Sequence, residues 1–179
     1  RIDVLVNAAA SSTPIGGAIE DVDIDALMAD VDVKVGGYLR YAQAVVPAMK
    51  RRGAGHIVNI GGLTGRSSDT LSGLRNAAVA HLTKVLSDQL GRFRISVNVV
   101  NPGIVRTPHL DELFAEMAEE RDVTAKDIEA EFVHDIPTGE ILSPAQVGQF
   151  IAFLANAQSP SITGQSLTID GGYSRGVYL

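Results

Sequence analysis

One stretch, residues 56–76, constrains the fold of this chain more than any other. It begins with the short apolar run 56–60, stops at Gly61-Gly62, and resumes as a helical pattern that carries Ser72 and Asn76. A short run rich in β-branched residues that ends in glycines and leads into a helix is typical of a buried parallel strand. Open α/β sheets bind their ligands at the carboxyl ends of such strands. The stretch therefore predicts where a functional site lies.

The same alternation extends along the whole chain, because apolar runs predict strands and helical spacing of apolar residues predicts the helices between them. The predicted strands cover residues 2–7, 56–60, 94–100 and 165–170. The predicted helices cover residues 25–52, 69–91 and 144–156, with two short ones at 111–120 and 124–133. This order predicts a doubly wound parallel sheet with helices on both faces, in a single domain that spans residues 1–179.

Three local features add detail to this fold. The charged, irregular segment 104–142 follows the third predicted strand, and we interpret it as a lid or substrate loop. The pair Gly36-Gly37 interrupts the long helix 25–52, where each glycine costs roughly 1 kcal/mol against alanine. Such a pair predicts the close approach of another helix or of a cofactor. Ser67, Ser68 and Asp69 are candidate caps of the next helix.

Composition excludes several kinds of partner. The chain has 15 Lys and Arg against 21 Asp and Glu, a net charge of −6, which argues against nucleic acid or an anionic membrane surface. No apolar run approaches the ~20 residues that span a bilayer. Cysteine is absent and the four histidines lack ligand spacing, so we expect no metal site. Residues 1–6 lack the layout of a signal peptide, which favours a cytoplasmic location.

Four parts of the sequence, taken together, resemble the short-chain dehydrogenase/reductase family. They are Leu5–Ala10, Val58–Gly62, Asn101–Thr107, and Ile162–Gln165 with Asp170–Gly172. Each is weak alone, but their order and spacing extend the match across the whole chain. The resemblance implies a Rossmann-like fold, an NAD or NADP cofactor and a small-molecule carbonyl or alcohol substrate. It also implies a homodimer or homotetramer in which the two long helices pair with their copies.

The resemblance also indicates which residues contact the cofactor. The predicted contacts are Asn7, Ala8, Ala9, Gly61, Pro102, Gly103, Ile104 and Thr107. A plain Pro-Gly turn is the alternative for Pro102 and Gly103. Family members begin with a strand, a glycine-rich turn and a helix that hold the pyrophosphate, and these 179 residues contain no such fingerprint. The first predicted strand resembles the family's fourth, so we interpret about three amino-terminal strand–helix units as missing from this sequence.

The catalytic positions depart from the family pattern of asparagine, serine, tyrosine and lysine, in which the tyrosine donates or accepts the proton. The matching residues here are Lys34, Gly62, Ser72 and Asn76. Lys34 and Asn76 are the reciprocal of the family's asparagine and lysine. We therefore expect their side chains to meet, in a polar cluster with Ser72 that polarises a carbonyl or binds an anion. Alternatively, Lys34 is an ordinary surface lysine, and Ser72 and Asn76 are polar residues that line a cleft.

Two functions from different classes follow. The first is an NAD(P)-linked oxidoreductase with a non-standard site. Its turnover of simple ketones should be slow, because an aliphatic hydroxyl is a poorer acid than a phenol with a pKa of about 10. The second is a non-catalytic or non-redox relative that keeps the scaffold for ligand binding or as a dimer partner.

Overall fold

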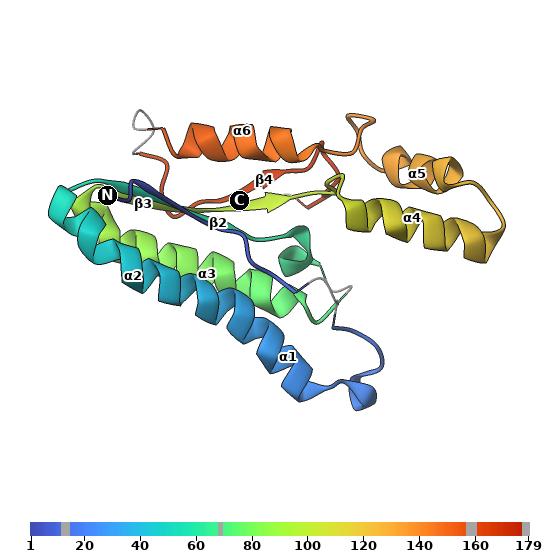
Figure 1. The fold of residues 1–179 in the computed structure, drawn as a ribbon, viewed down its shortest axis with the longest axis horizontal. Helices are drawn as coiled ribbons and strands as arrows, with labels where there is room; N and C mark the ends of the chain where they lie inside the picture. The colour runs from blue at the N-terminus through green and yellow to red at the C-terminus, as the bar shows by residue number, and fades with distance from the viewer. Residues whose placement is uncertain (12–14, 68–69, 157–160, 177–179) are drawn as a thin grey trace. The chain divides into compact units, whose positions relative to one another are not determined.

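The computed structural model describes residues 1–11, 15–67, 70–156 and 161–176. Within them, one sheet has the order β1-β2-β3-β4, and its strands are Val4–Asn7, Gly55–Ile60, Ile95–Pro102 and Ser166–Ile169 (Figure 1). β1, β2 and β3 pair in parallel, with Asn7 opposite Asn59 and Ile60 opposite Val100. The amide of Val99 donates to the carbonyl of Gln165 at 2.9 Å, beside the start of β4. The predicted α/β class and the four predicted strands are confirmed.

The helices follow the sequence pattern with one difference. They are α1 (Ile24–Val31), α2 (Gly37–Arg52), α3 (Gly73–Leu90), α4 (Pro108–Arg121), α5 (Ala125–His134) and α6 (Pro144–Leu154). The predicted helix 25–52 is found as α1 and α2, joined by a π-helical segment, Asp32–Gly36. π turns are rare in proteins, and those that occur often lie at functional sites. Lys34 lies within this one.

The predicted cap of α3, the predicted helix 69–91, is wrong in part. α3 begins at Gly73, and no side chain caps it with a hydrogen bond. Ser67 instead follows a short 3-10 segment, Leu63–Arg66, while Ser68 and Asp69 lie outside the described residues. The chain therefore enters α3 through a tight turn rather than through a polar cap.

The described chain forms two compact units. The first contains residues 1–101 and 151–167, with α1 to α3, β1, β2 and most of β3. α2 and α3 lie side by side on one face of this sheet (Figure 1). Their apolar side chains meet those of β2 and β3 in a core of Ala42, Val45, Met49, Ile57, Leu86, Leu90, Ile95 and Val97. This core packs against the first half of β2 and β3, and a second cluster of Tyr38, Val79 and Val99 lies nearer the carboxyl end of β2, where Gly61 follows.

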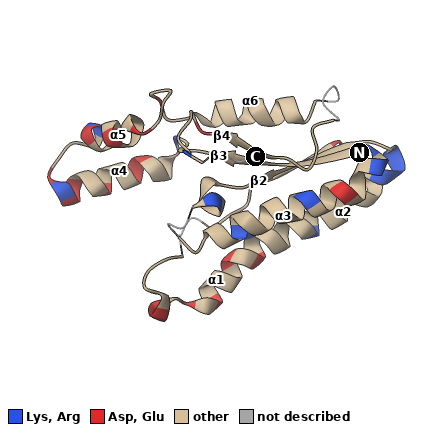
Figure 2. Ribbon diagram, turned by 180° about the vertical axis from the view of Figure 1, so that it is seen from behind, with Lys and Arg blue, Asp and Glu red and all other residues tan. Residues whose placement is uncertain are grey.

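The second unit contains residues 102–150 and 168–179, and so the whole predicted segment 104–142. That segment is more ordered than expected, because α4 and α5 pack around Phe114, Ala118 and Ile128. Figure 2 shows acidic and basic residues along both helices; among them, Arg121 pairs with Glu131 at 2.7 Å. The single-domain interpretation of residues 1–179 stays a prediction. None of the helices in the described ranges has the length and apolar character needed to cross a membrane.

Candidate functional site

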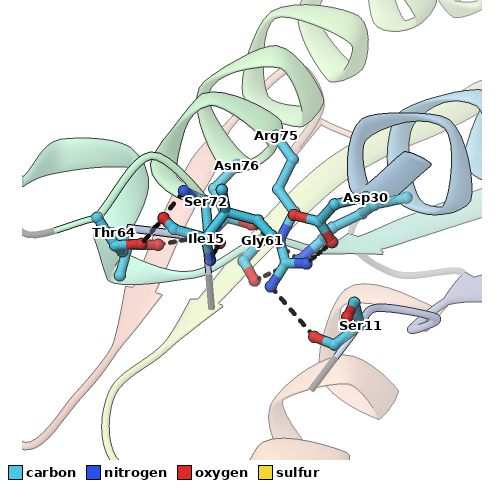
Figure 3. A network of polar contacts seen from close by, with 10 residues as sticks. Ser11, Ile15, Asp30, Gly61, Thr64, Ser72, Arg75 and Asn76 are labelled. Atoms are coloured by element: carbon cyan, nitrogen blue, oxygen red, sulfur yellow. Dashed lines mark hydrogen bonds and ion pairs between the residues drawn. The ribbon is translucent and has the colours of Figure 1, made fainter. Parts of the chain in front are cut away.

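The predicted contact between Lys34 and Asn76 is confirmed. Lys34 Nζ donates to Asn76 Oδ1 at 2.8 Å and to the carbonyl oxygen of Gly61 at 3.1 Å. Figure 3 shows the two accepting residues, Asn76 and Gly61. The two side chains belong to residues that are only 3% and 6% exposed, so the alternative of a surface lysine is wrong. Because Gly61 directly follows β2, the ammonium lies at the carboxyl edge of the sheet, where α/β folds bind ligands.

Asn76 connects the lysine to Thr64. An ammonium only donates hydrogen bonds, so Asn76 must turn its oxygen toward Lys34 and its NH2 group away. That NH2 group donates to Thr64 Oγ1 at 2.8 Å. A Cβ atom at Gly62 would lie 2.8 Å from Asn76 Nδ2, closer than real Cβ atoms approach. The glycine at the family's serine position therefore leaves the room that the Asn76 amide occupies.

Burial and two neighbouring charges act on Lys34. Removal of the ammonium from water lowers the pKa of Lys34 to about 8; Arg75 lowers it as well, and Asp30 opposes the change. Arg75 forms a buried ion pair with Asp30 and also donates to the carbonyl of Ser11 at 3.3 Å. Sequence reasoning missed this pair. The available signal was spacing, because Asp30 lies four residues before Lys34 and Arg75 adjoins Asn76.

Ser72 does not complete the predicted three-residue cluster. Its Oγ accepts from the amide of Ile15 at 2.8 Å, and its own amide donates to the carbonyl of Ile15 at 3.3 Å. The Thr70 hydroxyl donates to the same carbonyl at 2.6 Å. No hydrogen bond within the described residues joins Ser72 to Lys34 or Asn76. Ser72 therefore anchors the chain at Ile15 instead of extending the lysine network.

Tyr38 is a further residue that sequence reasoning did not assign to the site. Its hydroxyl donates to the carbonyl of Ile60 at 3.0 Å, and burial raises the pKa of Tyr38 to about 12. Lys34 and Tyr38 thus bind the successive carbonyls of Gly61 and Ile60. They hold the end of β2 against the π-helical segment and α2, and Tyr38 stays protonated at neutral pH.

The predicted cofactor contacts of the first unit lie at strand ends. Asn7, Ala8 and Ala9 line a cavity of about 260 Å³ at the carboxyl end of β1, together with Tyr38 and Tyr41. The Asn7 side chain is held by the neighbouring strand β2, because its Nδ2 donates to Asn59 Oδ1 at 2.9 Å. Gly61 contributes the carbonyl that binds Lys34.

The predicted cofactor contacts of the second unit belong to one connected loop. Pro102 is the last residue of β3, and the Gly103 amide donates to the carbonyl of Ile169 at 2.8 Å. The Ile104 carbonyl accepts from the amide of Leu142 at 3.0 Å. Thr107 caps α4, where its hydroxyl accepts from the amide of Leu110 at 3.3 Å. Each residue thus has a structural role, and their role in cofactor binding stays a prediction.

Comparison with known proteins decides the family. A family described as Enoyl-(Acyl carrier protein) reductase matches residues 1–174. A 7alpha-hydroxysteroid dehydrogenase from Bacteroides fragilis is 34% identical over 177 residues, 96% of this chain and 64% of that protein. The chain belongs to the short-chain dehydrogenase/reductase family. The Short-chain reductase protein NovJ from Streptomyces niveus is 31% identical over 96% of this chain and 64% of its own length. The chain thus spans about 64% of the length of these two relatives.

Solved structures show the same fold. YwfH, described as an NADPH dependent reductase involved in bacilysin biosynthesis, is 26% identical, with a TM-score of 0.90 over 99% of this chain and 68% of that chain. ElxO with NADP bound is 29% identical, with a TM-score of 0.83 over 97% of this chain and 67% of that chain. The Rossmann-like sheet of this short-chain dehydrogenase/reductase is therefore established.

Proposed function

We propose that this protein is an NAD(P)-linked oxidoreductase that interconverts a small carbonyl compound and its alcohol, with Lys34 as the cation of a non-standard site. One observation carries the proposal. In a chain of this family, a buried ammonium at the carboxyl end of β2 is bonded to Asn76, which occupies the family's lysine position. The structural relatives described as NADPH dependent or as NADP bound support the class of cofactor.

The residues present fit part of a nicotinamide cofactor. The cavity of about 260 Å³ at the end of β1 is lined by Asn7, Ala8 and Ala9, at the edge where dinucleotides bind in Rossmann folds. The glycine-rich turn that would hold the pyrophosphate is not found in these 179 residues. When bound, the cofactor supplies the hydride that reduces the carbonyl carbon, and the carbonyl oxygen takes up one proton.

Lys34 provides positive charge near that oxygen. With a pKa of about 8, the side chain is mostly protonated at neutral pH, and its burial strengthens its field on nearby groups. A fixed cation of this kind stabilises negative charge that develops on a reacting oxygen. The position of the family's tyrosine holds Ser72, whose oxygen is bonded to the amide of Ile15. Proton transfer must therefore come from water or from the substrate, and slow turnover of simple ketones is the consequence.

Deuterium transfer tests the proposal. The protein is incubated with millimolar 4-deuterated NADPH or NADH and with cyclohexanone, and the alcohol is analysed by mass spectrometry. We expect slow formation of deuterated cyclohexanol, strongly reduced in Lys34→Met. Lys84→Met is the matched control, because Lys84 lies on the surface of α3 with a side chain that is 62% exposed. Absence of transfer in the wild type would favour the second function, a non-redox relative that binds ligands.

A cytoplasmic location and a homodimer or homotetramer complete the proposal. Both stay predictions, and the second is what membership of the family implies.

A further inference from the structure

A second cavity, of about 430 Å³, lies beside Thr64 in the first unit. Its described lining consists of glycine, serine, threonine and aliphatic residues, and none of them carries a charge. Ile19 and Leu74, which are 76% and 53% exposed, contribute apolar surface to it. Cavities that combine apolar walls with a few fixed polar groups are typical of small-molecule sites. The described lining favours an uncharged compound, because a buried ion would find no counter-charge among these residues.

Thr64 connects this cavity to the lysine network. Its hydroxyl oxygen accepts the hydrogen bond from Asn76 Nδ2 at 2.8 Å. A hydroxyl has one proton to donate, and no hydrogen bond within the described residues uses the proton of Thr64. Because the amide donates to the oxygen, that proton must point elsewhere, and Thr64 lines the cavity. Thr64 is thus a side-chain donor that remains available beside the cavity.

The chain of hydrogen bonds has one direction. Lys34 donates to the Asn76 oxygen at 2.8 Å, and the Asn76 NH2 group donates to Thr64 at 2.8 Å. Each bond polarises the next, so the ammonium makes the amide a better donor and the amide makes the hydroxyl a better donor. Lys34 itself is 3% exposed, and Thr64 carries its influence to a place that a ligand can reach.

Close packing holds Thr64 in place. A Cβ atom at Gly73, the first residue of α3, would collide with the Thr64 carbonyl oxygen. The glycine therefore allows α3 to begin directly against the 3-10 segment Leu63–Arg66. A donor fixed in this way needs little rearrangement when a ligand arrives.

We propose that the Thr64 hydroxyl donates a hydrogen bond to the carbonyl oxygen of a small, uncharged substrate bound in this cavity. The inference rests on the proposed function, since it names the group that contacts the substrate's reacting oxygen. Thr64 is then a catalytic residue, Asn76 and Lys34 act on the substrate through it, and the substrate class is a neutral ketone or its alcohol.

The infrared band of a bound ketone tests the proposal without any cofactor. The probe is cyclohexanone labelled with 13C at the carbonyl, and the readout is the shift of its C=O stretch on binding. Wild type and Thr64→Ser, which keeps the hydroxyl, should both shift the band to lower frequency. Thr64→Val, which keeps the shape but has no hydroxyl, should lose the shift and bind the ketone two- to tenfold more weakly. An unshifted band in the wild type, or an equal shift in Thr64→Val, would overturn the proposal.

Two further measurements cover the other outcomes. Leu74→Lys, at an exposed position that tolerates substitution, should lose cyclohexanone binding measured by NMR titration; unchanged binding would place the ketone elsewhere. The carboxylate 4-oxocyclohexanecarboxylate should bind more weakly than cyclohexanone, and tighter binding would contradict the neutral class. A shifted band without deuterium transfer would keep the role of Thr64 in ligand binding and contradict the redox function alone.

Discussion

At the scale of single residues, the sequence predicted the Lys34–Asn76 contact because two family positions carry each other's residue types. Thr64 could not be found in this way. Its role depends on the turn after β2, which places the hydroxyl against the amide of Asn76. Ser72 was predicted to join the cluster, and it bonds to Ile15 because the loop at that residue lies against the start of α3. Two family positions that have exchanged residue types can be recognised in a sequence, whereas the contacts of a loop depend on how the folded chain packs.

Burial of Lys34 predicts a specific dependence of stability on pH. The pKa of Lys34 is lowered from 10.5 to about 8 in the folded protein. Below pH 8 Lys34 is protonated in both the folded and the unfolded protein, so the free-energy cost of burying its charge is fully present. Between these values the unfolded chain binds more protons, so this group makes the free energy of unfolding rise with pH. Urea titrations across this interval should give a steeper rise for wild type than for Lys34→Met.

Comparison of wild type with Lys34→Met isolates the contribution of Lys34 to the pH dependence of the free energy of unfolding. The pKa of Tyr38 is raised from 10.0 to about 12, which lowers stability above pH 10, and this contribution is common to both proteins. Equal slopes in wild type and Lys34→Met would mean that Lys34 keeps its ordinary pKa.

At the scale of elements, the boundaries of most helices followed from apolar spacing, and the π-helical segment Asp32–Gly36 did not. A π turn changes the register by about one residue, which a periodicity of 3.6 averages out over a long helix. The pair Gly36-Gly37 was the visible sign of an irregularity. The close contact that this pair predicted is made within the same helical segment, because a Cβ at Gly36 would collide with the Asp32 side chain.

The two glycines should respond differently to alanine. A Cβ at Gly37 would have no neighbour closer than 4.0 Å, and its backbone is helical. Gly37→Ala should therefore raise the free energy of unfolding by about 0.5–1 kcal/mol. Gly36→Ala should gain less, because its methyl group displaces the exposed Asp32–Arg40 ion pair. Thermal denaturation of both variants measures the difference, and an equal or larger gain for Gly36→Ala would be inconsistent with the π-helical geometry.

At the scale of the whole molecule, association through α2 and α3 is expected from the family. Ala42 is an unsuitable probe of that interface, because it is 1% exposed and packs in the core, where an arginine would unfold the protein. Val85, on α3, is 37% exposed. Val85→Arg should convert a dimer to a monomer in light scattering while the urea midpoint stays within experimental error. A wild type that is already monomeric would argue against this interface.

Cofactor affinity is a second property of the whole chain. The predicted cofactor contacts cover only parts of NAD(P), and the 179 residues contain no pyrophosphate-binding turn. Titration of NADH and NADPH, followed by nicotinamide fluorescence, should therefore show only weak binding to this chain. Low-micromolar affinity would show that other residues replace the missing turn.

The fold as a whole was readable from the sequence because strand and helix patterns alternate without interruption as far as Val100. Residues 104–142 were less readable, since charged residues hide the small core around Phe114 and Ile128. The capping box of Thr124 and Asp127 marks the start of α5, and it accounts for the agreement of that helix with its predicted range.

A swap of Lys34 and Asn76 tests whether the two side chains form one site. Free energies of unfolding are measured for wild type, Lys34→Asn, Asn76→Lys and the double variant. Asn76→Lys should be the least stable, because it brings two ammonium groups together beside Arg75. The double variant, which restores one cation and one amide, should be more stable than the sum of the single changes by at least about 1 kcal/mol. Additivity within about 0.5 kcal/mol would show that the two side chains do not interact, and would contradict the site proposed for this protein.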